Sequence, residues 1–268
     1  MPQTEVATEE RFGFGKNWAN FLTGLNPERI AEAELSLQEM LNVEDLNGMT
    51  FLDIGSGSGL FSLVARRLGA TVHSFDYDTD SVGCTTSLRN KYFPDDPNWK
   101  VEQGSALDPE YLESLGKFDI VYSWGVLHHT GDMWNALRYV DKCCKDDGLL
   151  YIALYPDRGF TSKVWTAVKK TYCSSTIGKW LMLGIFVPYF AIRGLAEDLV
   201  QGKNPTRRYN EYQKKRGMSM YYDWIDWIGG YPFEVSTIAQ ITDFYGDLGY
   251  ELLRVKPGGC DQYVFRKN

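Results

Sequence analysis

The sequence is poor in the residues that usually hold metals and carries no excess of positive charge. It has only 3 histidines among 268 residues, and its 5 cysteines show neither a CxxC pair nor the Cys/His spacing of a zinc site. The net charge of −7 does not suit a whole surface that binds nucleic acid. The acidic, polar N-terminal residues are neither a signal nor a transit peptide. These absences predict a cytoplasmic protein with reduced thiols and no structural metal.

A long apolar run is also missing. The apolar stretch over residues 180–192 has 13 residues and contains Pro188, so we expect it to be too short and too broken to span a bilayer. We favour a lid helix packed on the core. The alternatives are an interfacial helix or the wall of an apolar substrate pocket.

A glycine-rich turn between a strand and a helix indicates a cofactor site. Residues 51–59 read Phe-Leu-Asp-Ile-Gly-Ser-Gly-Ser-Gly, so an apolar run ends in Asp53 and residues 60–68 then show helical spacing. Glycines let the backbone approach a ligand closely where a side chain would block it. A second short apolar strand ends in Asp76. An acidic residue about 20 positions after the glycines is placed to bind the two hydroxyls of a ribose.

The glycine spacing favours one kind of nucleoside. A dinucleotide site requires G-x-G-x-x-G, but here Gly55, Gly57 and Gly59 alternate, and Leu60 takes the place of the third dinucleotide glycine. Asp53 would put a negative charge beside the phosphates. A positively charged cofactor without phosphate, S-adenosylmethionine, fits better.

The segment LDIGSGSG resembles the first motif of the class I S-adenosylmethionine-dependent methyltransferases. The resemblance covers about residues 48–155, and the nearest subgroup is the ubiquinone-biosynthesis-type small-molecule O-methyltransferases. It implies S-adenosylmethionine as the cofactor and methyl transfer as the reaction. No cluster of acids resembles the metal site of catechol-type enzymes, so no required metal is expected. The motif and the second acidic strand end give the cofactor-binding candidates Asp53, Gly55, Ser56, Gly57, Asp76 and Tyr77.

Apolar strands alternate with amphipathic helices along most of the chain. This pattern predicts an α/β fold, a doubly wound (Rossmann-like) seven-stranded sheet with helices on both faces. A Pro-Gly-Gly turn at 257–259 joins the last two strands, which predicts one antiparallel strand on a mostly parallel sheet. We expect strands at 49–54, 71–76, 99–103, 118–123, 148–154, 249–256 and 260–266, and helices at 29–41, 59–69, 79–92, 133–144 and 237–246.

Residues 157–230 interrupt the alternation as an insertion. Between residues 157 and 216 it carries twelve Lys or Arg against four Asp or Glu, a net charge of +8 that leaves −15 for the rest. Such asymmetry indicates an anionic partner or surface, including a peripheral membrane contact. The expected organisation is an N-terminal lid and helix (1–45), a cofactor-binding core (46–156), a basic, aromatic-rich helical lid (157–230) and a C-terminal helix and strand pair (231–268).

Two further loops follow predicted strands. In the family, the loop after the third strand reaches the adenine, usually with Asp where Ser105 stands here; its candidates are Gly104, Ser105 and Ala106. The loop after the fourth strand would lie beside the methionine part of the cofactor, with candidates Ser123, Trp124 and Gly125. It lacks the Asp/Asn-Pro-Pro-aromatic motif of amino-group methylases that act on nucleic-acid bases.

Two of the three histidines, His128 and His129, follow in the same loop. A base near neutral pKa could take a proton from a hydroxyl acceptor, although one of the pair is expected to cap or pack the next helix. Tyr231 is the third candidate catalytic residue. His73 lies within a strand and is expected to be structural.

Aromatic clusters outside the core supply the remaining candidates. Phe12, Lys16 and Trp18 either fold over the cofactor as a lid or anchor the first helix. The substrate-binding candidates, near an aromatic wall suited to a ring or sugar, are Tyr155, Arg216, Tyr222 and Trp224.

The sequence therefore predicts methylation of a small metabolite, on a hydroxyl or carboxyl oxygen of an anionic or amphiphilic acceptor. N- or C-methylation remains an alternative, as does a non-catalytic module that docks a partner or membrane. A nicotinamide dehydrogenase is disfavoured by Leu60 and Asp53, and a nucleic-acid methylase by the sequence pI of about 5.1.

Overall fold

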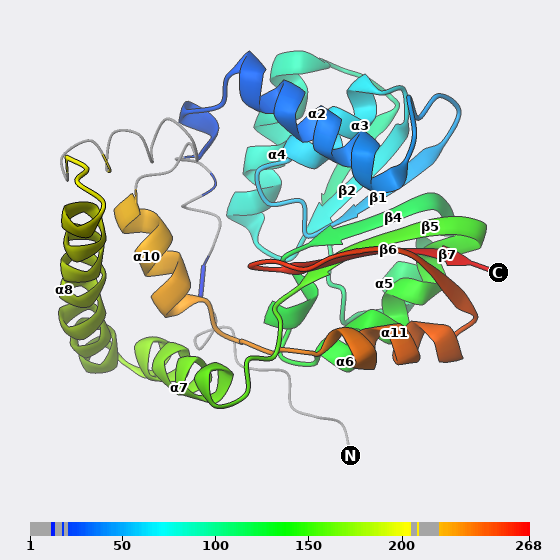
Figure 1. Cartoon of the computed structure of the whole chain (residues 1–268). Coiled ribbons are helices and arrows are strands. Elements are labelled where there is room, and N and C mark those ends of the chain that lie inside the picture. Colours follow the sequence, from blue (N-terminus) through cyan, green and yellow to red (C-terminus); the bar gives the residue numbers. More distant parts are fainter. Residues whose placement is uncertain (1–11, 14–17, 19–20, 205–207, 209–219) are drawn as a thin grey trace. The chain divides into compact units, whose positions relative to one another are not determined.

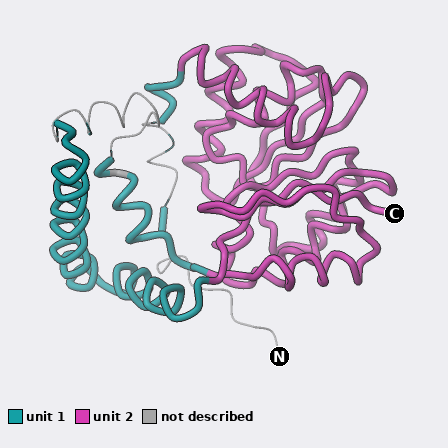
Figure 2. Tube along the Cα trace, in the orientation of Figure 1, with its two compact units in different colours: residues 1–25, 158–233 teal, residues 26–157, 234–268 magenta. Residues whose placement is uncertain are grey.

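The chain forms two compact units in the computed structural model, which describes residues 12–13, 18, 21–204, 208 and 220–268. Residues 26–157 and 234–268 form one unit, the core unit, and residues 1–25 and 158–233 form the other, the insertion unit (Figure 2). Helix α2 (Pro27–Leu41), which was grouped with the N-terminal lid in the sequence expectations, belongs to the core unit. Residues 231–233 belong to the insertion unit.

The core unit is built on a seven-stranded sheet in the order β3-β2-β1-β4-β5-β7-β6. The first five strands pair in parallel, and β7 runs antiparallel to both of its neighbours. The predicted α/β fold with one reversed strand is therefore confirmed. The strands are β1 (Thr50–Ile54), β2 (Thr71–Asp76), β3 (Trp99–Gln103), β4 (Phe118–Trp124), β5 (Cys144–Leu154), β6 (Tyr250–Lys256) and β7 (Asp261–Lys267).

Helices cover both faces of this sheet (Figure 1). One face carries α2, α3 (Leu60–Arg67) and α4 (Thr79–Tyr92), and the other carries α5 (Pro109–Ser114), α6 (Met133–Val140) and α11 (Ile238–Asp247). The central strands are apolar because both of their faces are covered. Leu52, Val121 and Ile152 are all fully buried.

One predicted boundary in the core unit is wrong. The helix expected over 133–144 ends at Val140, a 3₁₀ turn follows over Asp141–Cys143, and β5 begins at Cys144 rather than at 148. Cys144 already pairs with Phe118 of β4, and both cysteines are fully buried. Pairing with β4 thus assigns Cys144, the last residue of the predicted helix, to the strand.

The insertion unit contains three described helices, α7 (Phe160–Ser174), α8 (Thr176–Val200) and α10 (Met220–Gly229). They contact one another around a small core that includes Tyr172, Met182 and Ile228. The expectation that Pro188 breaks the apolar stretch is wrong, because α8 is one helix of 25 residues with Pro188 inside it. Phe186 and Phe190 pack into the same core on either side of Pro188, which holds the helix together there.

Helix α8 is therefore longer than the 13-residue stretch predicted. Within the described residues it is the one helix long and apolar enough to cross a membrane, by length and composition only. Only 6% of its most apolar 18-residue stretch is buried, so it differs from the core helix of a globular protein. One side of α8 packs on α7 and α10, and most of the rest of its surface is exposed.

Candidate active site

The candidate cofactor-binding residues of the core unit gather at one edge of the sheet. Strands β3, β2, β1 and β4 are neighbours and run in parallel, so the loops at their carboxyl ends meet there. The chain order reverses between β1 and β4, which is the position where open α/β sheets bind ligands. The candidates at these four strand ends are Asp53, Gly55, Ser56, Gly57, Asp76, Tyr77, Gly104, Ser105, Ala106, Ser123, Trp124 and Gly125.

The glycine turn after β1 has a backbone that side chains rarely adopt. Gly55, Gly57 and Gly59 have φ values of 76°, 55° and 79°. A Cβ on Gly55 would lie 2.4 Å from Cγ1 of Val126, and one on Gly59 would lie 2.9 Å from the Thr85 Cα. The loop after β4 therefore packs directly on the glycine turn, which requires the absence of a side chain at Gly55.

The carboxylate of Asp76 is fixed beside this turn. The backbone N–H groups of Gly57 and Asp78 each donate to it, at 2.9 Å. Burial raises the pKa of Asp76 to about 6, although these N–H groups act to lower it. Each carboxylate oxygen has two acceptor positions, so Asp76 retains the capacity to accept from the two hydroxyls of a ribose.

Asp53 is held in the interior by a buried relay of hydrogen bonds. The Trp99 Nε1–H donates to Ser74 Oγ at 2.9 Å, and Ser62 Oγ donates to Asp53 Oδ2 at 2.5 Å. Ser74 and Ser62 are joined at 2.7 Å. Because Ser62 gives its one proton to Asp53, Ser74 must donate to Ser62. The relay ties β3, β2, α3 and β1 together at the start of the glycine turn.

The environment of Asp53 is also unusual for a carboxyl group. Its side chain is 2% exposed. Burial raises the pKa of Asp53 to about 7, Ser62 acts to lower it, and the charge of Asp76 raises it further. Asp53 was predicted to bind cofactor. The structure shows its Oδ2 bonded to Ser62, so one of its oxygens is engaged within the protein.

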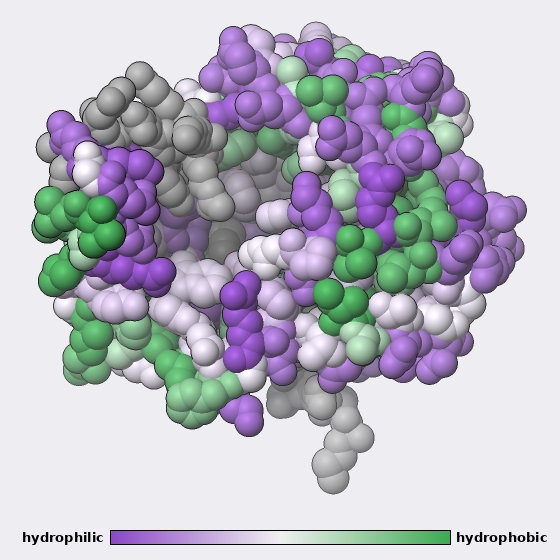
Figure 3. Space-filling view, in the orientation of Figure 1, coloured by the Kyte–Doolittle hydropathy of each residue, from purple (hydrophilic) through white to green (hydrophobic). Residues whose placement is uncertain are grey.

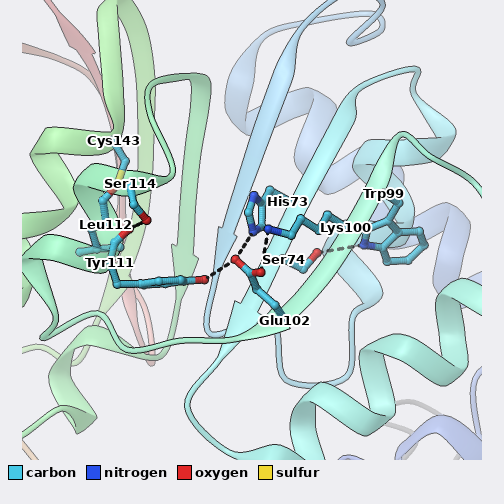
Figure 4. A network of polar contacts seen from close by, with 9 residues as sticks. All are labelled: His73, Ser74, Trp99, Lys100, Glu102, Tyr111, Leu112, Ser114 and Cys143. Carbon is cyan, nitrogen blue, oxygen red and sulfur yellow. Dashed lines mark hydrogen bonds and ion pairs between the residues drawn. The ribbon is translucent and has the colours of Figure 1, made fainter.

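The loop after β3 is lined by an aromatic ring. A Cβ on Gly104 would lie 2.3 Å from the ring of Tyr111, so ring and loop are in close contact. The Tyr111 hydroxyl donates to Glu102 at 2.9 Å, and Glu102 also pairs with His73 at 2.8 Å (Figure 4). Ser105 Oγ accepts from the Leu107 N–H at 3.1 Å, which leaves its own proton available to donate. Next to Ser105, Ala106 is buried.

Glu102 joins this aromatic ring to the strand behind it. Burial acts to raise the pKa of Glu102, but hydrogen bonds from Lys100, Tyr111 and His73 outweigh burial and lower it. Burial lowers the pKa of His73, against the effect of Glu102. His73 lies on β2 and takes part in this network, which fixes Tyr111 over the loop (Figure 4).

The loop after β4 uses its three candidate residues in different ways. Ser123 is fully buried, and its hydroxyl donates to the Ile54 carbonyl at 3.0 Å, so it holds β4 to β1. Trp124 is 42% exposed at the strand end. Gly125 has a φ of 75° and donates to the Ala153 carbonyl at 3.0 Å. This turn directs the chain toward the two histidines.

His128, His129 and Tyr155 form a cluster of rings. The ring of His128 lies 4.2 Å from that of Tyr155 and 4.4 Å from that of His129, centroid to centroid. His128 is fully buried and His129 is half-buried, so the packing role expected for one of the pair falls to His128. Tyr155 lies just after β5 and is half-buried.

Glu234 is hydrogen-bonded to this cluster, and the sequence analysis did not identify it as a site residue. Its backbone N–H donates to the His128 carbonyl at 3.0 Å, and its carboxylate accepts from the Met133 N–H at the start of α6. Burial raises the pKa of Glu234, against the effect of the Met133 N–H. The sequence analysis also did not identify Val126 and Tyr111, which are recognisable only from their close contacts with Gly55 and Gly104 in the folded chain.

The remaining candidates belong to the insertion unit. Phe12 donates its N–H to the Tyr231 carbonyl at 3.0 Å, and its ring packs on Gly229. Trp18 contacts Phe21, with ring centroids 5.9 Å apart. Trp224 lies 5.7 Å from the ring of Phe190. Lys16, Arg216 and the side chain of Tyr222 lie outside the described residues.

The charges around the glycine turn select among cofactors. Asp76, Asp78 and Asp80 act together on Cys84, and Asp76 acts on Asp53, so this region is acidic. Such a field opposes phosphate and favours a cation. No set of three or more His, Cys, Asp or Glu among the described residues is arranged to hold a metal.

The fold and this site define an α/β enzyme that binds a nucleoside cofactor without phosphate. A family model described as "Methyltransferase domain" matches residues 27–201. The match covers more than half of the chain, so the chain belongs to this family and is a class I S-adenosylmethionine-dependent methyltransferase.

Several curated proteins are similar in sequence. The ubiquinone biosynthesis O-methyltransferase of Pelagibacter ubique (strain HTCC1062) is 27% identical over 167 residues, which are 61% of this chain and 65% of the relative. The protein of the same description from Rhizobium rhizogenes (strain K84) is 28% identical over 52% of each chain. The chain thus spans between about half and two thirds of the length of these relatives.

A solved structure supports the fold. The magnesium protoporphyrin IX methyltransferase of Synechocystis PCC 6803, with bound S-adenosylhomocysteine, aligns with a TM-score of 0.53 at 14% identity. The alignment covers 93% of this chain and 86% of that one.

The residues present fit the family's cofactor, S-adenosylmethionine. The glycine turn has no side chains where a ligand would approach, and a Cβ at Gly55 or Gly59 could not be placed. In such a site Asp76 would accept from the ribose hydroxyls and the loop Gly104–Ala106 would border the adenine, and the acidic field suits a sulfonium cation.

Proposed function

We propose that this chain moves a methyl group from S-adenosylmethionine to a hydroxyl or carboxyl oxygen of a small metabolite. The observation that carries the proposal is the acidic nucleoside site beside the ring cluster of His128, His129 and Tyr155, all at the carboxyl ends of neighbouring strands. The names of the sequence relatives, ubiquinone biosynthesis O-methyltransferases, support oxygen as the acceptor atom.

The chain's own residues have three tasks in such a reaction. The bound cofactor supplies a methyl group already activated on sulfur. Asp76 and the glycine turn orient the nucleoside, and the buried charge of Asp53 favours the cation. His129 is half-buried and in contact with Tyr155, and in this proposal it takes the proton from an acceptor hydroxyl. A carboxylate acceptor would need no base, and positioning alone would then suffice.

The proposed acceptor is anionic or amphiphilic. The insertion unit supports this choice because its described part exposes lysines and surrounds an aromatic core. N- or C-methylation is the second possibility. A module that binds cofactor but has no turnover is the third. We also propose a cytoplasmic location, in keeping with cysteines that form no disulfide bond within the described residues.

Cofactor binding is tested first by calorimetric titration with S-adenosylmethionine and S-adenosylhomocysteine. Asp76→Asn removes the charge that the ribose site requires, and we expect the affinity to fall about 10- to 100-fold, since a hydrogen bond to a charged group contributes about 1.5–3 kcal/mol. Asp147→Asn is the matched control, because Asp147 is exposed and its φ of 63° suits Asn. Equal affinities in the two variants would refute the assignment of Asp76.

Methyl transfer is tested next with hydroxylated and carboxylated acceptors, and the product is identified by mass spectrometry. An ether or ester product supports the proposal, whereas a methylated amine or carbon would assign the reaction to the second possibility. His129→Gln should lower kcat for a hydroxyl acceptor and shift the pH profile, with KM for the cofactor unchanged. The same variant should leave a carboxylate acceptor unaffected. Cofactor binding without turnover on any acceptor would favour the non-catalytic module.

A further inference from the structure

Helix α8 has two apolar faces, and only one of them is covered. Its inner face carries Met182, Phe186 and Phe190, which pack with α7 and α10. Its outer face exposes large apolar side chains along its whole length, most of them three or four residues apart. These are Ile177, Trp180, Leu181, Ile185, Tyr189, Ile192, Leu195 and Leu199, all at least 46% exposed. We call this the outer face of α8.

The outer face is unusual for a surface in water. Single exposed apolar residues are normal, but a contiguous row indicates contact with a partner or membrane. Helix α7 also exposes apolar side chains near its start, with Phe160 at 80% and Val164 at 42%. Figure 3 shows apolar side chains gathered over α8 and α7.

The charged residues next to this face are mainly basic. Lys163, Lys170 and Lys179 are exposed, whereas the exposed Arg193 is paired with Glu197. The two acids of α8 are neutralised by arginine, since Asp198 pairs with Arg208 at 2.7 Å and Glu197 with Arg193 at 3.0 Å. An apolar row bordered by basic side chains is the pattern of a helix that lies on an anionic lipid surface.

The contacts of α8 favour a helix that lies flat over one that spans the membrane. Its inner face packs against α7 and α10, and its last turns carry the ion pairs of Glu197 and Asp198. A spanning helix would have to bury these charges in hydrocarbon or detach from its neighbours. Lying flat, α8 can place the outer face among the lipid tails and keep every one of these contacts.

A second copy of the chain fits the outer face less well. A two-fold contact would use the same surface on both partners. It would bring two sets of basic side chains toward each other, with the acids of α8 already paired. Anionic headgroups would instead neutralise Lys163, Lys170 and Lys179.

We propose that the outer face of α8 docks the protein on the surface of an anionic lipid bilayer, with the helix lying in the interface. The inference concerns binding and does not depend on the proposed methyl transfer. It gives the protein direct access to lipid-soluble or amphiphilic molecules held in the membrane.

The test is flotation of the full chain with vesicles of phosphatidylcholine mixed with phosphatidylglycerol, compared with phosphatidylcholine alone. We expect binding to the anionic vesicles that falls with added salt. Ile185→Gln with Ile192→Gln should reduce the bound fraction at least tenfold. The matched control is Leu35→Gln with Leu253→Gln, which removes two comparably exposed apolar side chains from the core unit and should bind as wild type.

Two further measurements separate the components of the interaction. Lys163→Glu with Lys170→Glu should abolish the preference for anionic vesicles. Brominated lipids should quench tryptophan fluorescence in the wild type, and the quenching should be much weaker in Trp180→Phe. Calorimetric titration with S-adenosylhomocysteine should give the wild-type affinity in each variant, which shows that the core unit is intact.

Three outcomes would overturn the proposal. The first is no binding of the wild type to anionic vesicles. The second is equal binding by the Ile185→Gln/Ile192→Gln and control variants. The third is a dimer of the wild type in lipid-free buffer that the Ile185→Gln/Ile192→Gln variant dissociates, because this result would assign the outer face to a second copy of the chain. Failure of methyl transfer would not affect any of these readings.

Discussion

Replacing Gly55 by alanine tests whether the glycine turn and the loop after β4 form one cofactor site. The turn holds Gly55 at a φ of 76°, where an alanine costs about 1–2 kcal/mol. The new Cβ would also lie 2.4 and 2.5 Å from the two methyl groups of Val126. Relieving such overpacking costs a further 1–3 kcal/mol, roughly. We therefore expect a total loss of about 2–5 kcal/mol in the free energy of unfolding.

The chain provides a matched control at Gly116. Its φ is 78°, nearly that of Gly55, but a Cβ there meets nothing within 4 Å. Gly116→Ala should therefore carry only the backbone cost of about 1–2 kcal/mol and leave cofactor binding unchanged. In Gly55→Ala, displacement of Val126 should weaken S-adenosylhomocysteine binding about 10- to 100-fold, which corresponds to roughly 1.4–2.8 kcal/mol.

The measurements are urea denaturation and calorimetric titration of both variants. Gly55→Ala combined with Val126→Ala removes the two nearest methyl groups, although the Val126 Cβ remains 2.9 Å away. The double variant should therefore recover part of the lost affinity. Equal effects of Gly55→Ala and Gly116→Ala on stability and affinity would show that the contact with Val126 has no importance for the site.

Two further predictions concern pH. The pKa values of Asp53, about 7, and Asp76, about 6, lie above the usual range for a carboxyl group, so the site becomes more negative between pH 5 and 8. Calorimetric titration over this range should show the cationic S-adenosylmethionine gaining affinity relative to the neutral S-adenosylhomocysteine by about tenfold. Parallel pH profiles for the two ligands would contradict this prediction. Burial lowers the pKa of Lys169 to about 7. Between pH 7 and 10 the unfolded chain therefore binds a proton that the folded chain lacks, and the free energy of unfolding rises with pH because of this group. Lys169→Met should raise the free energy of unfolding by up to about 4–5 kcal/mol at pH 7 and by little at pH 10, whereas an equal gain at both pH values would refute the reasoning.

Local sequence patterns were sufficient to predict where most strands of the sheet begin and end. The bounds of β2, β3 and α4 agree with those expected, because turn or capping residues mark their ends in the sequence. Asp78 caps α4, for example, by accepting from the Asp80 N–H. The glycine turn was recognisable because its conformation requires glycine at fixed spacing, which is a property of a few consecutive residues.

Elements whose limits depend on distant partners were predicted less well. Pairing with β4 starts β5 at Cys144, and packing in the insertion unit carries α8 through Pro188. Neither partner is visible in the local sequence. The same holds for the roles of individual side chains: Ser123 bonds to Ile54 and Asp53 to Ser62, while Glu234 meets the start of α6.

The sequence by itself determined the class of protein and the cofactor. Alternating apolar segments, three spaced glycines and an acid at the next strand end are short-range features, and each has a direct chemical consequence. Tertiary structure decided which side chains meet at the strand ends, that His128 is buried while His129 is half-buried, and that α8 exposes an apolar face. These properties depend on contacts between residues far apart in the chain, because burial and exposure are set by the neighbours that the fold supplies.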